Sequence, residues 1–364
     1  MRYTAAVLEG YSQPLAVREI EMRDPNPDQL VVRTTAVPFC STDYLGWKGM
    51  RLRKPPVILG HTAVGVVEGI GTDVTRFAVG DRVVVAGTPE CGECYYCKVG
   101  RPDQCAVLTE QSGDPVVATL PDGSDVMAGG RVGAYAQKIL VQENQVWPND
   151  STLPDAVASL IGCGITTGLG AVFNIAKVQP GQSVAIVGLG HLGQWMVQGA
   201  RLAGASQIIA IDIVDERRRI ALTHGATDVI DPTISDPVKA VQDLTEGRGA
   251  DVTLEAAGPE QAMQQAVAMT RKAGTVVLTG VSHHTATVTL AQALITTRGR
   301  TIHSCQNGES KLGRDIPRWL ALLETGELDA AHIITKEYAL SEINEAMIAS
   351  GELRDLSGVI TRFQ

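Results

Sequence analysis

The segment Ser183–Trp195 constrains this chain most, because it combines a short apolar run, a glycine turn and an apolar-periodic continuation. The run Val-Ala-Ile-Val predicts a buried parallel strand, and the residues after the turn recur at helical spacing. At such a junction, free backbone N–H groups and the positive end of the helix dipole bind a pyrophosphate. Gly188 permits the turn, Gly190 admits the phosphate, and Gly193 lets the helix pack on the strand.

A second apolar run, Gln207–Asp212, ends in an acid, where a carboxylate binds the adenosine ribose hydroxyls of a dinucleotide. The alternative is a purely structural turn in another α/β sheet. Because a carboxylate repels a 2′-phosphate, Asp212 favours NAD over NADP. Three arginines complicate this choice, because a guanidinium can bind phosphate, although they also suit a solvated helix face with Arg217 flanking the adenosine. The predicted cofactor-binding residues on this segment are Gly188, Gly190, His191, Leu192, Gly193, Asp212 and Arg217, whereas Arg218 and Arg219 are the other two arginines of that helix face.

Bulk properties narrow the class of protein. A length of 364 residues favours two domains, and a net charge of −9 without a basic cluster argues against a nucleic-acid partner. No apolar run reaches the roughly 18–20 residues that span a bilayer, which argues against a membrane partner. The start of the chain lacks a signal-peptide core. We therefore expect a cytoplasmic protein whose seven cysteines bind metal or do chemistry rather than form disulfides.

The hydrophobic pattern changes at about residue 155, from short strands separated by turns to strands alternating with helices. The expected early strands are 3–8, 16–21, 30–36, 63–70 and 82–86. The later ones are 184–187, 208–211, 228–230, 252–254, 276–278 and 301–303, with helices over 194–203, 216–224, 237–246, 260–271 and 290–297. Six strands with five crossovers predict an α/β fold with a doubly wound parallel sheet after a β-rich domain. A further capped helix is expected over Ser341–Gly351, with Ser341 as its N-cap.

Four cysteines form the most specific local motif, and they are Cys91, Cys94, Cys97 and Cys105. Four thiolates in one loop surround a Zn²⁺ ion tetrahedrally and leave no position for substrate, which indicates a structural site. An iron–sulfur cluster is the first alternative and a thiol switch the second.

Three further residues, Cys40, His61 and Cys163, could make an open metal site. Taken singly, a buried cysteine is usually core and a lone histidine structural. Together they would supply two thiolates and one imidazole, with a fourth position left for water or an alcohol oxygen.

Five segments occur in the order seen in one family: Phe39–Asp43, Gly60–Gly65, the four-cysteine lobe, Gly162–Gly168 and Gly188–Gly193. In these motifs the chain resembles zinc-dependent alcohol dehydrogenases of the medium-chain dehydrogenase/reductase family. The resemblance extends from Tyr3 to Phe363. The resemblance implies hydride transfer between an alcohol, or its aldehyde or ketone, and NAD(P). It also implies a GroES-like catalytic domain over 1–160 and 307–364, with a structural-zinc lobe at about 89–106, and a Rossmann domain over 161–306.

The same resemblance implies roles for individual residues. Cys40, His61 and Cys163 correspond to catalytic zinc ligands, so that two zinc ions are expected per chain. Thr42 would begin a proton relay beside the substrate oxygen, and Asp43 would orient the imidazole of His61. Arg354 would lie near the cofactor pyrophosphate. The family also implies a homodimer or homotetramer, for which Val288–Leu290 and the strand near Thr301 would suit edge pairing.

Some positions depart from the family pattern. Thr62 stands where a glutamate is usual, Leu45 where many members have the relay histidine, and Ser41 where arginine or histidine is common. Gly87 stands where liver-type enzymes have a bulky pocket wall, which predicts a roomier pocket. These changes keep two alternatives open: a reductase of activated C=C or imine bonds on the same scaffold, and a non-catalytic cofactor-binding redox sensor.

Overall fold

The computed structural model describes residues 1–51, 53–109 and 113–364 and divides into two compact units. Unit 1 comprises Met1–Cys163, Lys311–Gly326 and Ile333–Gln364, and unit 2 comprises Gly164–Ser310 and Glu327–His332. Residues 327–332, which we call the return segment, thus belong to unit 2, whereas the sequence predicted that they belong to the catalytic domain. In the ranges that the structure describes, no single helix is long and apolar enough to cross a membrane, and only a bent pair of short helices, residues 155–162 with 164–176, meets that test jointly.

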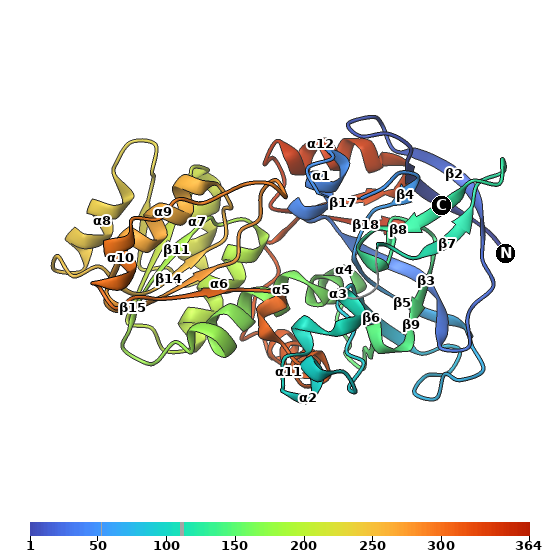
Figure 1. Cartoon of the computed structure of the whole chain (residues 1–364), viewed down its shortest axis with the longest axis horizontal. Coiled ribbons are helices and arrows are strands. Elements are labelled where there is room, and N and C mark those ends of the chain that lie inside the picture. The colour runs from blue at the N-terminus through green and yellow to red at the C-terminus, as the bar shows by residue number, and fades with distance from the viewer. Residues whose placement is uncertain (52, 110–112) are drawn as a thin grey trace. The chain divides into compact units, whose positions relative to one another are not determined.

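Unit 1 is β-rich and contains a closed barrel beside a larger sheet (Figure 1). The barrel strands are β1 (Arg2–Leu8), β2 (Ala16–Met22), β7 (Val116–Thr119), β8 (Asp125–Ala128) and β4 (Val57–Ile58). The larger sheet runs in the order β10 (Val146–Pro148), β6 (Arg82–Ala86), β5 (Thr62–Ile70), β3 (Gln29–Pro38), β18 (Ser357–Arg362) and β17 (Ile334–Ala339), and β9 (Lys138–Gln142) pairs with β3. One apolar core, from Tyr3 to Ile360, joins the two. Side-chain alternation on these strands directs the apolar residues into that core.

Short helices connect the strands of unit 1. They are α1 (Ser41–Trp47), α2 (Tyr95–Lys98), α3 (Ala106–Thr109), α4 (Asp155–Ser159), α11 (Leu312–Glu324) and α12 (Ile343–Gly351). The predicted cap of the last helix is wrong: α12 begins at Ile343, after a 3-10 turn over Leu340–Glu342. The Glu342 carboxylate accepts the Ala339 N–H at 2.6 Å, so the acid three residues on, rather than Ser341, satisfies the backbone there.

Unit 2 is built on a six-stranded, all-parallel sheet in the order β13, β12, β11, β14, β15, β16, which is the predicted doubly wound arrangement. The strands are β11 (Ser183–Val187), β12 (Gln207–Ile211), β13 (Asp228–Ile230), β14 (Ala250–Glu255), β15 (Thr270–Leu278) and β16 (Thr301–Ser304). The helices are α5 (Gly164–Gly170), α6 (His191–Leu202), α7 (Asp215–Thr223), α8 (Pro237–Leu244), α9 (Glu260–Met269) and α10 (Gln292–Thr296).

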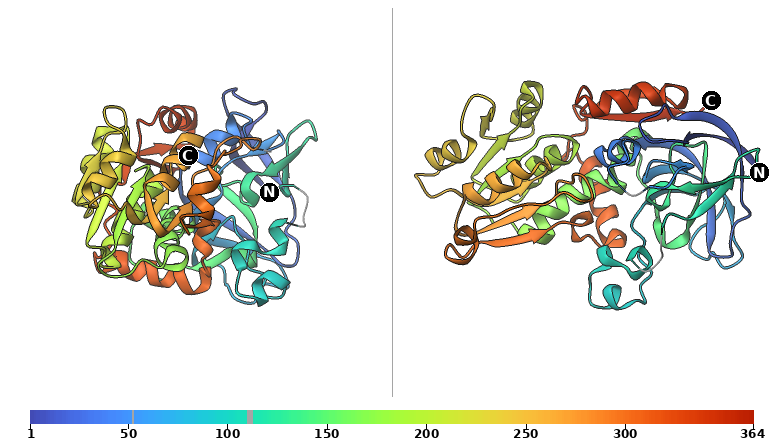
Figure 2. Two further views of the ribbon diagram at one scale, coloured as in Figure 1. Left: turned by 60° about the vertical axis from the view of Figure 1, so that its left-hand side comes forward. Right: turned by 45° about the horizontal axis from the view of Figure 1, so that its top comes forward.

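Alternate residues of β11 face two separate apolar cores, which shows why helices cover both sides of the sheet (Figures 1 and 2). Val184 and Ile186 join the core that contains α6, and Ala185 and Val187 join the core that contains α8 and α9. Both faces of the strand are therefore buried, as its unbroken apolar sequence predicts.

Helix α9 is shorter than predicted, because the strand β15 begins where the helix was expected to continue. The Thr270 carbonyl accepts the Arg300 guanidinium at 2.8 Å and 2.5 Å, and the Thr270 hydroxyl bonds that of Thr253 at 2.7 Å. These contacts with distant residues end the helix at Met269.

Candidate active site and cofactor groove

Cys40, His61 and Cys163 meet inside unit 1, although they come from three distant parts of the chain. Cys40 is the residue before α1, His61 precedes β5, and Cys163 follows the turn after α4. Their ligand atoms all lie within 4.8 Å of one another. Two sulfur atoms and one imidazole nitrogen form a donor set that suits Zn²⁺ with one position open.

The orientation of His61 is fixed by Asp43, which is 5% exposed. The His61 Nδ1–H donates to Asp43 Oδ1 at 3.2 Å, and the Gly60 backbone N–H donates to the same oxygen at 3.0 Å. Because a carboxylate only accepts, Nδ1 donates its proton to Asp43, and Nε2 is the nitrogen that a metal would use. This is the arrangement by which a carboxylate prepares a histidine for a metal.

The protonation of the three residues is strongly perturbed. A hydrogen bond from the Cys163 thiol holds the pKa of Cys40 well below its ordinary value, with smaller contributions from His61 and Thr42. Sharing that proton raises the pKa of Cys163. Burial lowers the pKa of His61, but the negative charges of Asp43 and Cys163 outweigh burial and raise it. Negative charge therefore concentrates where a cation would bind.

Thr62, which stands in place of the usual glutamate, bonds to the neighbouring strand. Its hydroxyl is buried and donates to the Val85 carbonyl at 2.8 Å. A Cβ atom on Gly162 would lie 1.8 Å from the Thr62 hydroxyl oxygen, so the glycine before Cys163 lets the two segments touch. This threonine is a packing residue beneath the cluster.

Gly87 has a packing role that the sequence did not reveal. A Cβ atom at Gly87 would lie 2.7 Å from the Gly130 carbonyl oxygen and 3.0 Å from that of His61. The glycine is needed because two backbone segments press against it. Packing therefore explains this glycine, and the roomier pocket stays a prediction.

Two residues that the sequence did not single out face the cluster. Tyr135 is fully buried, stacks on Phe39 at 4.9 Å between ring centroids, and has its pKa raised by burial and by the charges of Asp43 and Cys40. Burial lowers the pKa of Arg51, whereas the charges of Cys40 and Asp43 act in the opposite direction. No local motif surrounds either residue, so only the three-dimensional contacts identify them.

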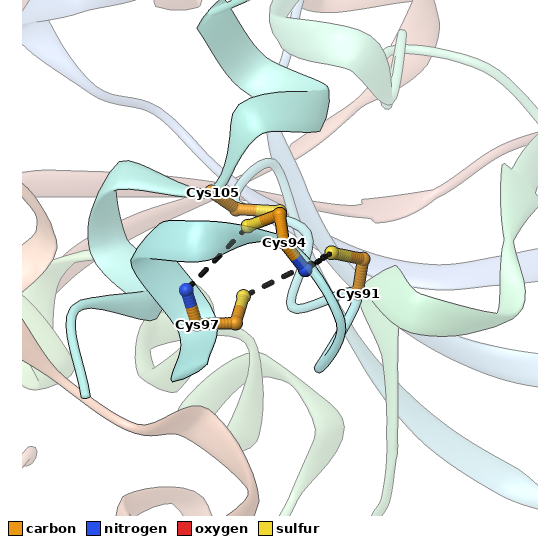
Figure 3. Close-up of side chains that lie close together, drawn as sticks. All are labelled: Cys91, Cys94, Cys97 and Cys105. Atoms are coloured by element: carbon orange, nitrogen blue, oxygen red, sulfur yellow. Dashed lines mark hydrogen bonds between the residues drawn. The ribbon is translucent and has the colours of Figure 1, made fainter. Parts of the chain in front are cut away.

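The four cysteines of the lobe also converge, as Figure 3 shows. Backbone N–H groups point at the sulfur atoms: those of Cys97 and Ala106 donate to Cys94 Sγ, and that of Cys94 donates to Cys91 Sγ, each at 3.4 Å. The Ala106 and Cys97 N–H groups lower the pKa of Cys94 to about 6. All cysteines of the chain are free thiols in this structure, and the lobe fits one tetrahedral ion.

The glycine turn of unit 2 makes an open cradle at the start of α6. Gly190 is the N-cap of α6 and supplies no side chain to its free N–H groups. A Cβ atom at Gly193 would lie 1.9 Å from the Gly188 carbonyl oxygen, whereas one at Gly190 would approach only the Arg217 guanidinium, at 3.7 Å. Gly193 is thus required by packing, and Gly190 faces open space beside a cation. A pyrophosphate fits this arrangement.

Asp212 lies at the end of β12 and holds the turn in place. Its two oxygens accept the backbone N–H groups of Leu189 at 2.6 Å and Val214 at 2.8 Å. Each carboxylate oxygen has a further lone pair for a ribose hydroxyl.

The three neighbouring arginines differ from one another. Arg218 is buried and donates to the Asp212 carbonyl at 2.6 Å, so it is not part of a solvated face. Arg219 is an exposed partner of Glu216 at 2.8 Å. Burial lowers the pKa of Arg217, and the nearby Asp212 charge opposes that effect. Only Arg217 therefore combines a position beside the cradle with a charge that a ligand could use.

Glu255, at the end of β14, was not predicted to take part in this edge of the sheet. Its buried carboxylate accepts the N–H groups of Ala257 at 2.8 Å, Gly258 at 2.6 Å and Gly280 at 3.2 Å. It fixes two loops at the carboxyl ends of β14 and β15. The position of an acid directly after the apolar strand was the only available signal.

Three other residues that were predicted to bind the cofactor make different contacts in the structure. The His191 ring packs on Gly164, where a Cβ atom would come within 1.5 Å of Nε2. Leu192 packs, partly buried, against the core around α6. Arg354 belongs to unit 1 and its guanidinium pairs with Glu352 at 2.8 Å. None of these contacts assigns a cofactor role to the three residues.

Comparison with known proteins gives matches over nearly the whole chain. Residues 26–155 match the family described as "Alcohol dehydrogenase GroES-like domain", and residues 192–325 match "Zinc-binding dehydrogenase". The chain is 32% identical to putative alcohol dehydrogenase D of Mycobacterium tuberculosis, covering 99% of this chain and 100% of the relative. It is 31% identical to the NDMA-dependent alcohol dehydrogenase of Amycolatopsis methanolica, covering 99% of each. The solved structure of benzyl alcohol dehydrogenase from Acinetobacter calcoaceticus aligns over 100% of both chains, with 28% identity and a TM-score of 0.92.

Proposed function

The chain belongs to the zinc-type alcohol dehydrogenases of the medium-chain dehydrogenase/reductase family, and on that premise we propose that it interconverts an alcohol and its aldehyde or ketone with NAD(H) at Cys40, His61 and Cys163. The observation that carries the proposal is the meeting of these three residues, with Asp43 holding His61 in the tautomer a metal needs. The names of the relatives, which are alcohol dehydrogenases, support oxidation and reduction of a small-molecule substrate.

Cys40, His61 and Cys163 would hold the catalytic zinc ion, and Cys91, Cys94, Cys97 and Cys105 a structural one. When bound, zinc supplies Lewis-acid polarisation of the substrate oxygen, and the nicotinamide supplies the hydride acceptor or donor. Asp43 keeps the imidazole in place, and the hydrogen bond shared by the two thiols leaves negative charge at the position of the ion. The protein thus contributes position and charge, not redox chemistry.

Thr42 is the side chain that we assign to the substrate's hydroxyl proton. The Thr42 hydroxyl donates a hydrogen bond to Cys40. Its oxygen keeps a lone pair that can accept the proton of the substrate while the proton of the hydroxyl is passed on. Leu45 has no polar group to continue that route, so we place the next carrier in solvent. The departure at Leu45 then lowers the rate of proton transfer but leaves the metal ligands intact.

The cofactor that we favour is NAD rather than NADP. Asp212 supports it, because a second negative charge beside this carboxylate would be repelled. Arg217 is the arginine that we place beside the adenosine, because its guanidinium lies 3.7 Å from the position of a Cβ atom at Gly190. Comparing kcat/KM for the two cofactors tests the preference directly, and a higher value with NADP would reject it.

The decisive experiment follows NADH absorbance with a panel of primary, secondary and aromatic alcohols, in the wild type and in Cys163→Ala. We expect the variant to lose the catalytic zinc ion and its turnover, while Cys305→Ala retains both. Cys305 is the matched control, because it is a partly buried cysteine of unit 2 outside both clusters. Turnover that survives in Cys163→Ala would reject the mechanism. Reduction of an enal at C=C rather than C=O would favour the alternative reductase.

For assembly and location we propose a homo-oligomer in the reducing cytoplasm. Strand β16 ends the sheet, so its outer edge offers unpaired backbone groups to another copy. Seven free thiols, six of them in metal-type clusters, are suited to a compartment that keeps cysteines reduced.

A further inference from the structure

A third group of metal-type side chains lies within unit 2, and nothing above uses it: His224, Asp329 and His332. His224 is the residue after α7, and the other two belong to the return segment 327–332. Their ligand atoms lie within 4.8 Å of one another, with His332 Nδ1 3.6 Å from Asp329 Oδ2. The group therefore joins two segments that are far apart in sequence.

The tautomer of His224 follows from its neighbour Gln194, which is completely buried in α6. The Gln194 side-chain amide donates from Nε2 to the Leu189 carbonyl at 3.1 Å and to the Arg217 carbonyl at 2.9 Å. Two carbonyl acceptors fix that end of the amide as the nitrogen, so the other end is the oxygen. His224 Nδ1 lies 3.0 Å from this oxygen and must carry the proton.

His224 Nε2 is consequently a bare lone pair, and its position is unusual. The residue is 3% exposed, and this nitrogen is buried without a hydrogen-bond donor among the residues that the structure describes. An unpaired buried acceptor is unfavourable, so an electron-pair acceptor at this point would relieve that cost.

The return segment holds the other two ligands in place. The Asp329 N–H donates to Gln198 Oε1 at 2.7 Å, and Gln198 Nε2 donates to the Asp329 carbonyl at 2.9 Å. The Ala331 N–H occupies Asp329 Oδ1 at 2.7 Å, which leaves Oδ2 free to face His332. The backbone is thus fixed against α6, while the Asp329 and His332 side chains are 49% and 58% exposed and can adjust.

We propose that His224, Asp329 and His332 bind a divalent first-row transition metal ion, with Zn²⁺ as the first candidate. Two imidazoles and one carboxylate are borderline donors that suit Zn²⁺, whereas Mg²⁺ and Ca²⁺ prefer oxygen alone. Bonds of about 2.0–2.1 Å would bring tetrahedral donors to about 3.4 Å apart, and rotation of the two exposed side chains closes the remaining gap. Gln194 is the partner that orients the buried histidine.

The site would clip the return segment to unit 2 by linking it to the end of α7. Water would take the fourth position, and no redox change accompanies binding. The proposal does not rest on the proposed dehydrogenase activity, because none of its residues belongs to the other two clusters.

The test is equilibrium dialysis of untagged, full-length protein against micromolar free Zn²⁺, followed by elemental analysis. We expect the wild type to hold one more equivalent per chain than His332→Ala and than Asp329→Asn. Both changes are at exposed side chains, so the fold should be kept. His284→Ala is the matched control, as an exposed histidine outside the group, and it should retain the full amount. Equal zinc content in the wild type and His332→Ala, or the same loss in His284→Ala, would overturn the proposal.

A second readout locates the ion on the buried residue without altering it. In ¹⁵N-histidine spectra, the unprotonated Nε2 resonance of His224 should shift on Zn²⁺ addition in the wild type and stay unchanged in His332→Ala. No shift in the wild type would also overturn the proposal. Because the spectra do not measure turnover, failure of the dehydrogenase assay leaves this result interpretable.

Discussion

At the residue scale, Asp43 is the side chain on which the cysteine–histidine cluster most depends, because it accepts a hydrogen bond from Nδ1 and so fixes the His61 ring. We expect Asp43→Asn to weaken zinc binding at this cluster by about 10–100-fold, since the amide keeps the shape but loses the charge that supports the imidazole. Competition with a metal chelator measures the change.

Asp315→Asn is the matched control for that substitution. Asp315 is also a fully buried acid of unit 1, and it accepts the Lys311 N–H at 3.1 Å and pairs with Arg314 at 2.6 Å, outside the cluster. It should reduce stability without changing zinc affinity. Equal chelator sensitivity of the two variants would mean that Asp43 acts only through the fold.

Residue types in the sequence were enough to select the cysteines and His61, because metal donors belong to a short list of side chains, and the family resemblance added Asp43. They could not select Tyr135, Arg51 or Gln194. These three matter through contacts between segments that are distant in sequence, and a tyrosine, an arginine or a glutamine in isolation has no distinguishing pattern. Likewise, Gly87 looked permissive until its two backbone neighbours were known.

At the element scale, Asp251 ties together three strands of the parallel sheet. Its carboxylate accepts the Ser183 N–H and hydroxyl, both at 2.8 Å, and the Arg271 guanidinium at 2.6 Å. Burial raises the pKa of Asp251, but these donors outweigh burial and hold it below its ordinary value. We expect Asp251→Asn to lower the free energy of unfolding by about 1–3 kcal/mol at neutral pH, as judged by urea denaturation.

The pH dependence of the free energy of unfolding tests that prediction further. A lowered folded-state pKa means that the carboxylate stabilises the protein above its unfolded pKa, about 3.9, and that this contribution is lost as the pH falls toward the folded value. The difference between wild type and Asp251→Asn should therefore be constant near neutral pH and shrink below about pH 4. Asp243→Asn, at an exposed surface pair with Lys239, is the control and should change little.

The cysteine lobe is an element whose order should come from its metal. Helix α2 has no buried residue, and Tyr95 and Val99 are 73% and 54% exposed, so apolar burial contributes little there. We predict that chelation, or Cys94→Ser without chelation, opens the lobe to trypsin at Lys98. Mass spectrometry of the fragments measures this, with Cys305→Ser as the control that stays protected. An unchanged digest after complete zinc loss would refute a structural role for the ion.

Periodicity predicted the parallel sheet well, because short apolar runs alternate with amphipathic helices. It failed at the junction of α9 and β15, where Arg300 takes the Thr270 carbonyl, and at Ser341, where Glu342 caps the backbone instead. Both errors arise at ends of elements, where one hydrogen bond decides between two geometries and local propensity is nearly neutral.

At the scale of the whole molecule, we predict assembly through the β16 edge of unit 2. Val288 precedes this edge in the chain and is 39% exposed, and Val229 on the opposite edge strand, β13, is 38% exposed. If copies assemble through the β16 edge, a charged side chain at position 288 would be buried at the interface, which is unfavourable. Val288→Asp should therefore reduce the oligomer by light scattering after size exclusion, while Val229→Asp should not. Dissociation by the second variant alone would move the interface to β13.

The overall division into a β-rich unit and a parallel-sheet unit follows from the change in periodicity near residue 155. The short return of 327–332 to unit 2 could not be predicted, because those six residues contain no strand or helix pattern. Their membership depends on hydrogen bonds to Gln198 and Arg201.

Strand β18 has six residues and lies between β3 and β17 rather than at the margin of its sheet. Its Val359 and Ile360 pair with Pro38 and Val37, which were synthesised more than 300 residues earlier. While the ribosome is still translating, this sheet therefore has a gap with two open edges, and the nascent polypeptide must be kept from aggregating through them. A stop codon before Ser357 would leave a product that lacks this inner strand, and the quality-control machinery should degrade it.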